Sequence, residues 1–146
     1  MNKKIIITIP IIIILVSLYI FNVNQIDEKS LSNTFEFSAV YFDDSHVVKI
    51  SFLDRSNYTN AAILEIEGLS QPFQKKYDNS SFLVVIPISS TPQYGWNTIP
   101  VTLLIDHKEF GKLILKTEIV PYGQPSPKVI YSRPSTNQVS FYLFLI

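Results

Sequence analysis

TIPVTLLIDHKEFGKLILKTEI, residues 98–119, has the clearest strand pattern in this chain. In its first half every second residue is apolar, and that set is Ile99, Val101, Leu103 and Ile105. Beyond the polar residues 106–109 the alternation resumes with Leu113, Leu115, Thr117 and Ile119. A period of two is typical of a β-strand with one buried face. The stretch therefore predicts a β-hairpin whose two strands share an apolar face, with a turn at residues 106–109.

The same alternation recurs from residue 34 onward. Strands are predicted at residues 35–41, 46–52, 61–67 and 73–77. Val48, Ile50 and Phe52 share one face of the second strand, and Ala62, Leu64 and Ile66 are predicted to point inward from the third. The 73–77 strand follows Pro72 and contains two adjacent lysines, which are features that keep a sheet edge from pairing further. Residues 82–88 form a continuous apolar run. Such a run predicts a strand buried on both faces in the middle of a sheet.

About seven short strands at regular spacing, with no amphipathic helix between them, predict an all-β fold. This pattern is typical of an antiparallel β-sandwich, and the commonest members of that architecture are immunoglobulin-like and fibronectin-like. We therefore predict an Ig-like or fibronectin-like sandwich over residues 34–120. The resemblance is architectural, because the chain has no cysteine and so lacks the Cys, Trp, Cys spacing of immunoglobulin domains.

The run from Ile5 to Phe21 is apolar and uncharged and contains nine isoleucines. As a helix it would be roughly 25 Å long, at the short end of a bilayer span. Lys3 and Lys4 precede it and acidic residues follow it, so the positive-inside rule favours a cytoplasmic amino terminus. We predict a transmembrane signal-anchor helix at residues 5–23. The chain is then a single-pass membrane protein, with residues 1–4 inside the cell and the carboxyl-terminal domain outside.

Two other interpretations of this leader stay open. A cleaved signal peptide has a shorter apolar region that ends in a small-x-small site, and the nearest such pair here, Ser30 and Ser32, lies well beyond the run. The run could also be the buried segment of a soluble protein. A helix placed before a β domain also resembles the type IV pilin and archaellin class, whose leaders often end in glycine where this chain has Lys4. A pilin-like or secretion-assembly subunit is therefore the alternative function.

Three further segments flank the predicted domain. Residues 24–33 are predicted to be a polar linker, and residues 121–138, with four prolines, an extended linker. Residues 139–146 are uncharged and almost wholly apolar, and we predict an apolar carboxyl-terminal strand. This strand could dock on its own domain or enter a partner or the bilayer surface, and it could also mark a truncated chain.

Composition excludes several classes of function. Residues 5–146 hold ten basic and twelve acidic side chains, a formal charge of −2, so no nucleic-acid partner is expected. The lack of cysteine excludes thiol redox chemistry, zinc ribbons and lipoprotein acylation. An exported domain without disulfides fits a prokaryotic cell envelope better than an animal secreted module.

The sequence shows no catalytic constellation. None of its serines sits in a Gly-x-Ser-x-Gly elbow, and Glu65 and Glu67 are predicted to lie on a solvated strand face. His46 lies next to Asp43 and Asp44, which are predicted to form an ordinary turn, and His107 is assigned to a solvated hairpin tip. We therefore expect no enzyme activity and no cofactor or metal. A metal- or small-ligand-binding accessory domain, using either histidine, is the least favoured alternative.

The remaining candidate site residues are aromatic side chains and asparagines. Trp96, beside Tyr94 in a loop, is either a core plug or an exposed anchor for a partner. In the tail, the candidates for partner binding are Phe141, Tyr142 and Phe144. Asn57 and Asn79 each begin an Asn-x-Ser/Thr motif and are candidate glycosylation acceptors, about as many as chance provides. The predicted function is a binding or structural module of the cell envelope, with an unknown protein partner.

Overall fold

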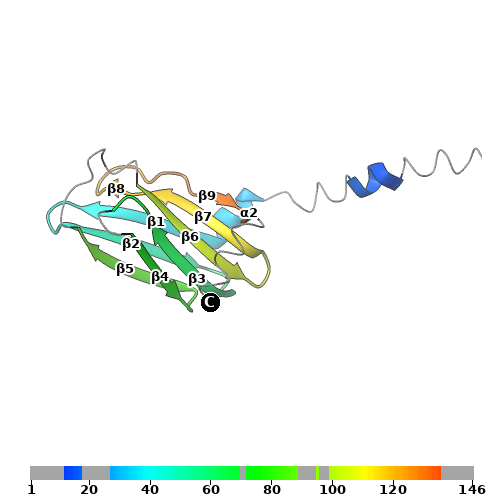
Figure 1. Ribbon diagram of the computed structural model, residues 1–146, viewed down its shortest axis with the longest axis horizontal. Coiled ribbons are helices and arrows are strands. Elements are labelled where there is room, and N and C mark those ends of the chain that lie inside the picture. The colour runs from blue at the N-terminus through cyan, green and yellow to red at the C-terminus, as the bar shows by residue number, and fades with distance from the viewer. Residues whose placement is uncertain (1–11, 18–26, 70–71, 89–94, 96–98, 136–146) are drawn as a thin grey trace, which may run out of the picture.

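The computed structural model describes residues 12–17, 27–69, 72–88, 95 and 99–135. Residues 27–135, where described, form two β-sheets packed face to face, with the short helix α2 (Glu28–Thr34) at one end (Figure 1). The strands are β1 (Phe35–Phe42), β2 (Val47–Asp54), β3 (Thr59–Ile66), β4 (Phe73–Tyr77), β5 (Ser81–Pro87), β6 (Pro100–His107), β7 (Gly111–Glu118), β8 (Val120–Pro121) and β9 (Ile130–Ser132).

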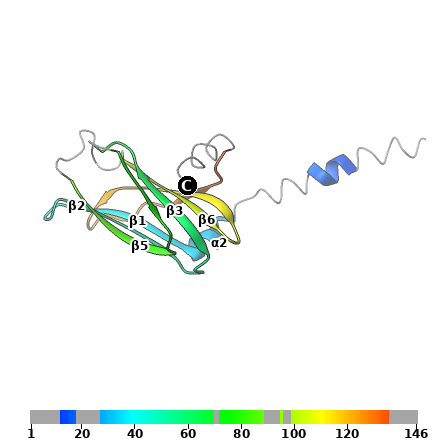
Figure 2. The same cartoon turned by 60° about the horizontal axis from the view of Figure 1, so that its bottom comes forward.

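Three antiparallel hairpins build most of the sandwich. The first, β1–β2, lies in sheet A, whose strand order is β5-β2-β1-β8. The other two, β3–β4 and β6–β7, lie in sheet B, whose order is β4-β3-β6-β7-β9. Among the described strands the one parallel pair is β1–β8. Figure 2 shows the two layers, with β1, β2 and β5 in one and β3 and β6 in the other.

The core lies between the sheets and is formed by the faces that the sequence predicts. Every second residue of β1 from Phe35 to Tyr41 is buried, as are Val48, Ile50 and Phe52 of β2. On the facing sheet the predicted inward sets of β3, β6 and β7 are at most 5% exposed, and they are Ala62, Leu64, Ile66, Val101, Leu103, Ile105, Leu113, Leu115 and Thr117. The hairpin prediction for residues 98–119 is thus confirmed in its faces.

The prediction that residues 82–88 form a central strand is wrong. β5 pairs with β2 on one side and is the last strand of sheet A. Its alternate side chains, Leu83 and Val85, are 67% and 49% exposed. The prediction of an edge strand at residues 73–77 is confirmed, because β4 ends sheet B. An uninterrupted apolar run shows that both faces of a strand are apolar, but it does not show how many neighbours the strand has.

The segments predicted as linkers carry secondary structure. Residues 24–33 include most of α2, which begins after Asp27; the carboxylate of Asp27 accepts hydrogen bonds from the backbone N–H groups of Lys29 and Ser30. Residues 121–138 include β9, which pairs with β7. Of the leader, residues 12–17 are described and are helical, with exposed side chains. Within the described residues no helix combines the length and apolar content that a membrane span requires.

Candidate functional site

A buried polar network joins two loops at the end of the sandwich next to α2. Asp54 ends β2 and His107 ends β6, and both side chains are fully buried. Ser56, in the loop after β2, places its Oγ 2.6 Å from Asp54 Oδ1 and 2.9 Å from His107 Nε2. The prediction that His107 is a solvated tip is therefore wrong, because the turn itself is Lys108–Phe110 and His107 belongs to the strand.

This network contains serine, histidine and aspartate, but it is not arranged as a catalytic triad. His107 Nδ1 accepts hydrogen bonds from the backbone N–H groups of Glu109 and Phe110. Nε2 then carries the proton of the neutral ring and donates toward Ser56 Oγ, whose own proton goes to Asp54. A histidine in this tautomer cannot take the serine proton as a general base. The network therefore holds the two loops together.

Asp54 is the centre of this network. Its carboxylate also accepts hydrogen bonds from the backbone N–H groups of Tyr58 and Thr59 and from the Thr59 hydroxyl. Burial raises the pKa of Asp54, but the hydrogen bonds from Ser56 and Thr59 outweigh burial, so the net shift of the pKa is downward. The carboxylate is thus kept ionised, as an acceptor that orders the β2–β3 loop.

The structure places the two histidines far apart. His107 packs edge to face against Phe35 at the start of β1, with ring centroids 5.2 Å apart, whereas His46 lies in the turn after the end of β1. Eight strand residues between them span roughly 25 Å. His46 Nδ1 is instead 3.2 Å from the Tyr41 hydroxyl, which also donates to Asp43. In the described part of the chain no group of three or more His, Cys, Asp or Glu side chains could hold a metal ion.

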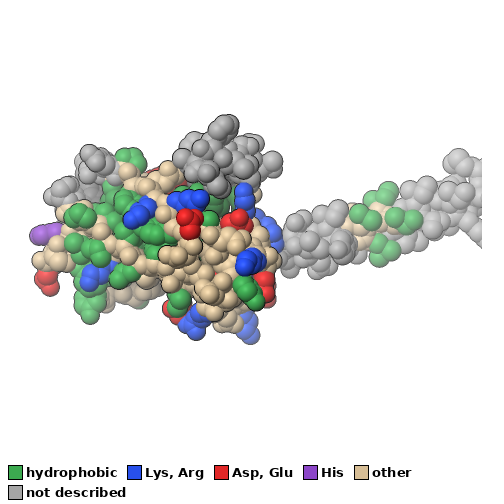
Figure 3. Space-filling view, turned by 90° about the horizontal axis from the view of Figure 1, so that it is seen from below, with side chains coloured by type: hydrophobic (Ala, Val, Ile, Leu, Met, Phe, Trp, Pro, Cys, Tyr) green, Lys and Arg blue, Asp and Glu red, His purple; other side chains and the backbone are tan. Residues whose placement is uncertain are grey.

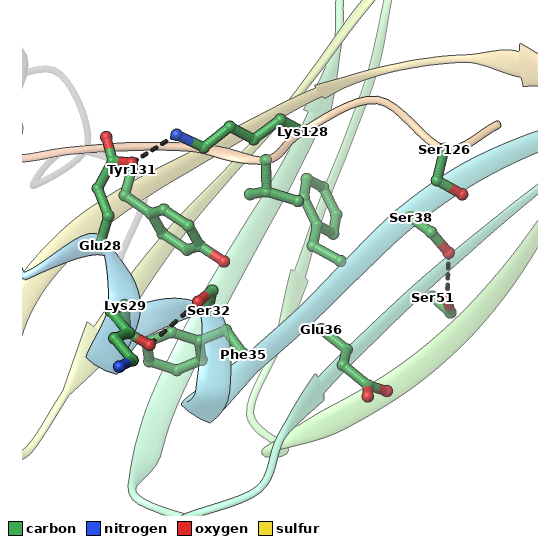
Figure 4. Close-up of a pocket in the computed structure, with 12 residues that line it drawn as sticks. Glu28, Lys29, Ser32, Phe35, Glu36, Ser38, Ser51, Ser126, Lys128 and Tyr131 are labelled. Carbon is green, nitrogen blue, oxygen red and sulfur yellow. Dashed lines mark hydrogen bonds and ion pairs between the residues drawn. The ribbon is translucent and has the colours of Figure 1, made fainter.

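An open groove of about 720 Å³ runs along β1 between α2 and residues 126–131, which we call the α2–β1 groove (Figure 4). Its apolar side chains are Phe35, Phe37, Val129 and Tyr131, its serines are Ser32, Ser38, Ser51 and Ser126, and its charged side chains are Glu28, Lys29, Glu36 and Lys128. An ion pair between Glu28 and Lys128 bridges its two walls at one end, as Figure 4 shows.

The backbone of β1 faces this groove with an unpaired stretch. The Phe35 N–H bonds to the Leu31 carbonyl of α2, and the Tyr41 carbonyl accepts from Tyr122 beyond β8. Because backbone groups of alternate residues point to the same side of a strand, the N–H and C=O of Phe37 point the same way, into the groove. No described backbone group bonds to Phe37 from that side. The groove thus offers a short length of free sheet edge.

The outer face of sheet A is the second unusual surface. Its residues include Leu83 and Val85 of β5, Leu53 of β2 and Tyr122 after β8, which are 40% to 73% exposed. Figure 3, seen from the side on which β4 and β5 lie, shows hydrophobic side chains reaching the surface over a broad area. The outer face of sheet B differs, since its apolar residues Ile63, Leu104 and Ile114 are buried.

The structure does not bring together the site residues that the sequence proposed. Tyr94, Trp96, Phe141, Tyr142 and Phe144 lie outside the described residues. Asn57 and Asn79 are exposed, in the β2–β3 loop and the β4–β5 turn. Ser81 of the second glycosylation motif is exposed, whereas the hydroxyl of Thr59 in the first is buried and donates to Asp54.

Neither the Asp54 network nor the α2–β1 groove is among the sites predicted from the sequence. The signal for the first was Asp54 followed by Ser56 and Thr59, a spacing that suits side-chain to backbone hydrogen bonds in a loop. No local sequence pattern indicates the groove, because its walls are far apart along the chain.

Comparison with known proteins assigns no family to this chain. No protein-family model, no curated protein and no solved structure matches it.

Proposed function

We propose that this protein is a membrane-anchored binding module of the cell envelope that holds an extended segment of a partner protein in its α2–β1 groove. The observation that carries this proposal is the unpaired backbone of Phe37, which lies along an open groove of about 720 Å³. An extended peptide that adds to a sheet edge gains affinity from backbone hydrogen bonds and specificity from alternate side chains. The protein then acts by binding and carries no catalytic activity.

The charges around the groove favour a segment without net charge. Glu28 is paired with Lys128, and Glu36 is paired with Arg55, so most ionised groups at the rim already have partners. Burial, assisted by the nearby Glu28 carboxylate, raises the pKa of Tyr131, so its phenol stays neutral. An uncharged peptide with apolar side chains at alternate positions would contact Phe37 and Val129 without losing a favourable ion pair.

The order of the strands supports the Ig-like or fibronectin-like assignment. In immunoglobulin constant domains strand A pairs with B and B with E, while C, F and G pair in the other sheet. Here β1, β2 and β5 have the first arrangement, and β3, β6 and β7 have the second. Such folds host many unrelated functions, so the groove rather than the fold carries the proposal.

Filling the groove should abolish peptide binding. We expect peptides selected from a random phage-displayed library on the full chain in mild detergent to bind about tenfold or more weakly to Ser38→Arg, whose side chain would occupy the groove. Binding is measured by fluorescence anisotropy with the selected synthetic peptides. Lys116→Arg, on an exposed strand position of sheet B outside the groove, is the control. Selected peptides that bind Ser38→Arg as well as the native chain would refute the groove as the site.

Labelling of single cysteines tests the anchor and its orientation. Because the chain has no cysteine, Asn2→Cys and Asn79→Cys each carry one thiol. We expect a membrane-impermeant maleimide added to intact cells to label Asn79→Cys, in an exposed turn, and to leave Asn2→Cys unlabelled until the cells are lysed. The full-length chain should stay in the membrane after alkaline carbonate extraction. Labelling of both positions in intact cells, or release of a shortened chain, would refute the anchor.

A second candidate function is a subunit of an assembly built by strand addition. The same free stretch of β1 favours it, because residues 139–146 of a neighbouring copy have the apolar, uncharged character that the groove accepts. Deletion of residues 139–146 separates the two functions. Loss of an oligomer upon deletion would favour the assembly, and an unchanged oligomeric state with retained peptide binding would favour the binding module.

A further inference from the structure

β5 is the sheet edge that lacks the usual protection against further pairing. Among the described edges, β4 carries the exposed Lys75 and Lys76, β8 is two residues long and ends in a proline, and β9 is three residues long. These are recognised devices that keep edges from pairing. β5 has seven residues, none of them charged, exposes Leu83 and Val85 on its outer face, and has its one proline, Pro87, only at its last position. A long, apolar and uncharged edge is a template for another strand.

The backbone register shows which groups of β5 are free. The Asp54 N–H donates to the Ser80 carbonyl and the Ile88 N–H donates to the His46 carbonyl, so even-numbered residues of β5 bond to β2. Odd-numbered residues therefore direct their backbone groups away from the sheet. No described backbone group bonds to Leu83 or Val85 from that side. A partner strand that supplies hydrogen bonds to these unpaired backbone groups lowers the free energy of the paired state.

We propose that β5 pairs with β5 of a second copy of this chain, antiparallel about a twofold axis at Val84, so that sheet A continues through a dimer. In this register Leu83 of one copy lies opposite Val85 of the other, and the two form a hydrogen-bonded pair. The ladder pattern gives about four hydrogen bonds from these two residues and their symmetry mates. Phe82 then lies opposite Ile86 of the other copy, on the core side.

The chemistry of the strand favours a copy of itself as the partner. A twofold contact places a surface against the same surface, so the surface must not repel itself. The strand Ser81–Pro87 meets this condition because it has no charge, whereas β4 with its two lysines does not. Lys49, the charged neighbour of Val85 on β2, has its Nζ 4.4 Å from the centroid of the Phe42 ring on the opposite side, over β1. The β5 edge is thereby left uncharged.

The flanks of the two open edges explain why they take different occupants. The free part of β1 is recessed between α2 and residues 126–131, which leaves room for a single extended chain. The β5 edge has no described element beyond it in sheet A, so a whole domain can approach it. This dimer does not depend on the groove, on its ligand or on the membrane anchor.

Cysteine cross-linking of the full chain in mild detergent tests the proposed register. Val84→Cys places the two thiols opposite each other in a non-hydrogen-bonded pair, with Cα atoms about 4.5 Å apart, a separation that a disulfide can bridge. We expect mild oxidation to convert this variant to a disulfide-linked dimer. In Ser81→Cys the two thiols would be about 20 Å apart along the strands, so this variant should stay monomeric on a non-reducing gel.

A charged side chain on the β5 edge should dissociate the dimer. Val85→Lys places a positive charge against the partner strand, and we expect the dimer dissociation constant from sedimentation equilibrium to rise about a hundredfold. Leu53→Lys, on the same outer face but one strand further in, should leave this constant unchanged. Circular dichroism checks that both variants fold. If Val85→Lys does not fold, the cross-linking of Val84→Cys still tests the proposal.

Three outcomes would overturn the proposal. The native chain could be monomeric at the highest attainable concentration. Ser81→Cys could cross-link as readily as Val84→Cys. Deletion of residues 139–146 could abolish a dimer that Val85→Lys leaves intact, which would place the dimer contact in the tail and away from the β5 edge.

Discussion

Replacement of Asp54 by alanine is expected to lower the free energy of unfolding by roughly 3 to 5 kcal/mol, the upper end of the range for single substitutions, which is reached when a buried hydrogen-bond network is broken. The carboxylate accepts hydrogen bonds from Ser56, Tyr58 and Thr59, through three backbone N–H groups and two hydroxyls. Without it these buried donors lose their acceptor, and each pays its desolvation cost. Urea unfolding of the full chain in mild detergent, followed by far-ultraviolet circular dichroism, measures the change.

Two further variants make this expectation specific. Asp78→Ala removes an aspartate whose side chain is 74% exposed and 3.6 Å from Lys76, and it should cost less than about 0.5 kcal/mol. Asp54→Asn keeps the shape but replaces one acceptor oxygen with a donor, so it should cost about 1 to 3 kcal/mol. Equal stability of Asp54→Ala and Asp78→Ala would show that the network does not order the loop.

The same residue determines part of the pH dependence. Because the pKa of Asp54 in the folded protein is lowered, its ionised form stabilises the fold above the unfolded pKa of about 4. This contribution is lost as the pH falls from there through the folded pKa. Stability of the native chain should therefore decrease below about pH 4, and Asp54→Asn should show a flatter acid limb.

Replacement of Phe52 by alanine is expected to cost about 3 to 5 kcal/mol, as for other buried aromatic residues. Phe52 is 2% exposed and lies between Phe35 and Phe82, with ring centroids 6.1 and 5.6 Å away. This row of rings continues to Tyr77 of the opposite sheet, which stacks on Phe82 at 3.9 Å. Removing the central ring leaves a cavity and breaks the row.

Leu83→Ala is the matched control for this loss. Leu83 lies on the neighbouring strand of the same sheet but is 67% exposed, so its truncation in the monomer should change the unfolding free energy by less than about 0.5 kcal/mol. Urea midpoints at low protein concentration compare the two variants. A loss at Leu83 that grows with protein concentration would indicate burial of this residue in the dimer.

The strands and their buried faces could be predicted because their signal is local. Alternation of apolar side chains at 99–105 and 113–119 requires no knowledge of which strand lies alongside. The seven predicted strands therefore correspond to β1 to β7, with their inward faces confirmed for β2, β3, β6 and β7. The lysines of β4 also predicted an edge, because the residues that protect an edge strand from further pairing belong to that strand itself.

The place of β5 and the role of His107 could not be predicted, because both depend on distant residues. The run at residues 82–88 is apolar on both faces whether it lies in the middle of a sheet or at an edge. His107 looks polar and turn-like in sequence, yet the Asp54 and Ser56 that bury and orient it come from a loop about fifty residues away.

The β class, the strand periods and the apolar leader follow from the order of residues alone, because neighbours along the chain set these properties. Which strands end the sheets, how Asp54 and His107 meet, and where the α2–β1 groove opens become visible only in the folded protein. Strand pairing and the burial of polar groups depend on segments that are far apart in sequence. The free stretch of β1 and the open edge at β5 both arise from that pairing.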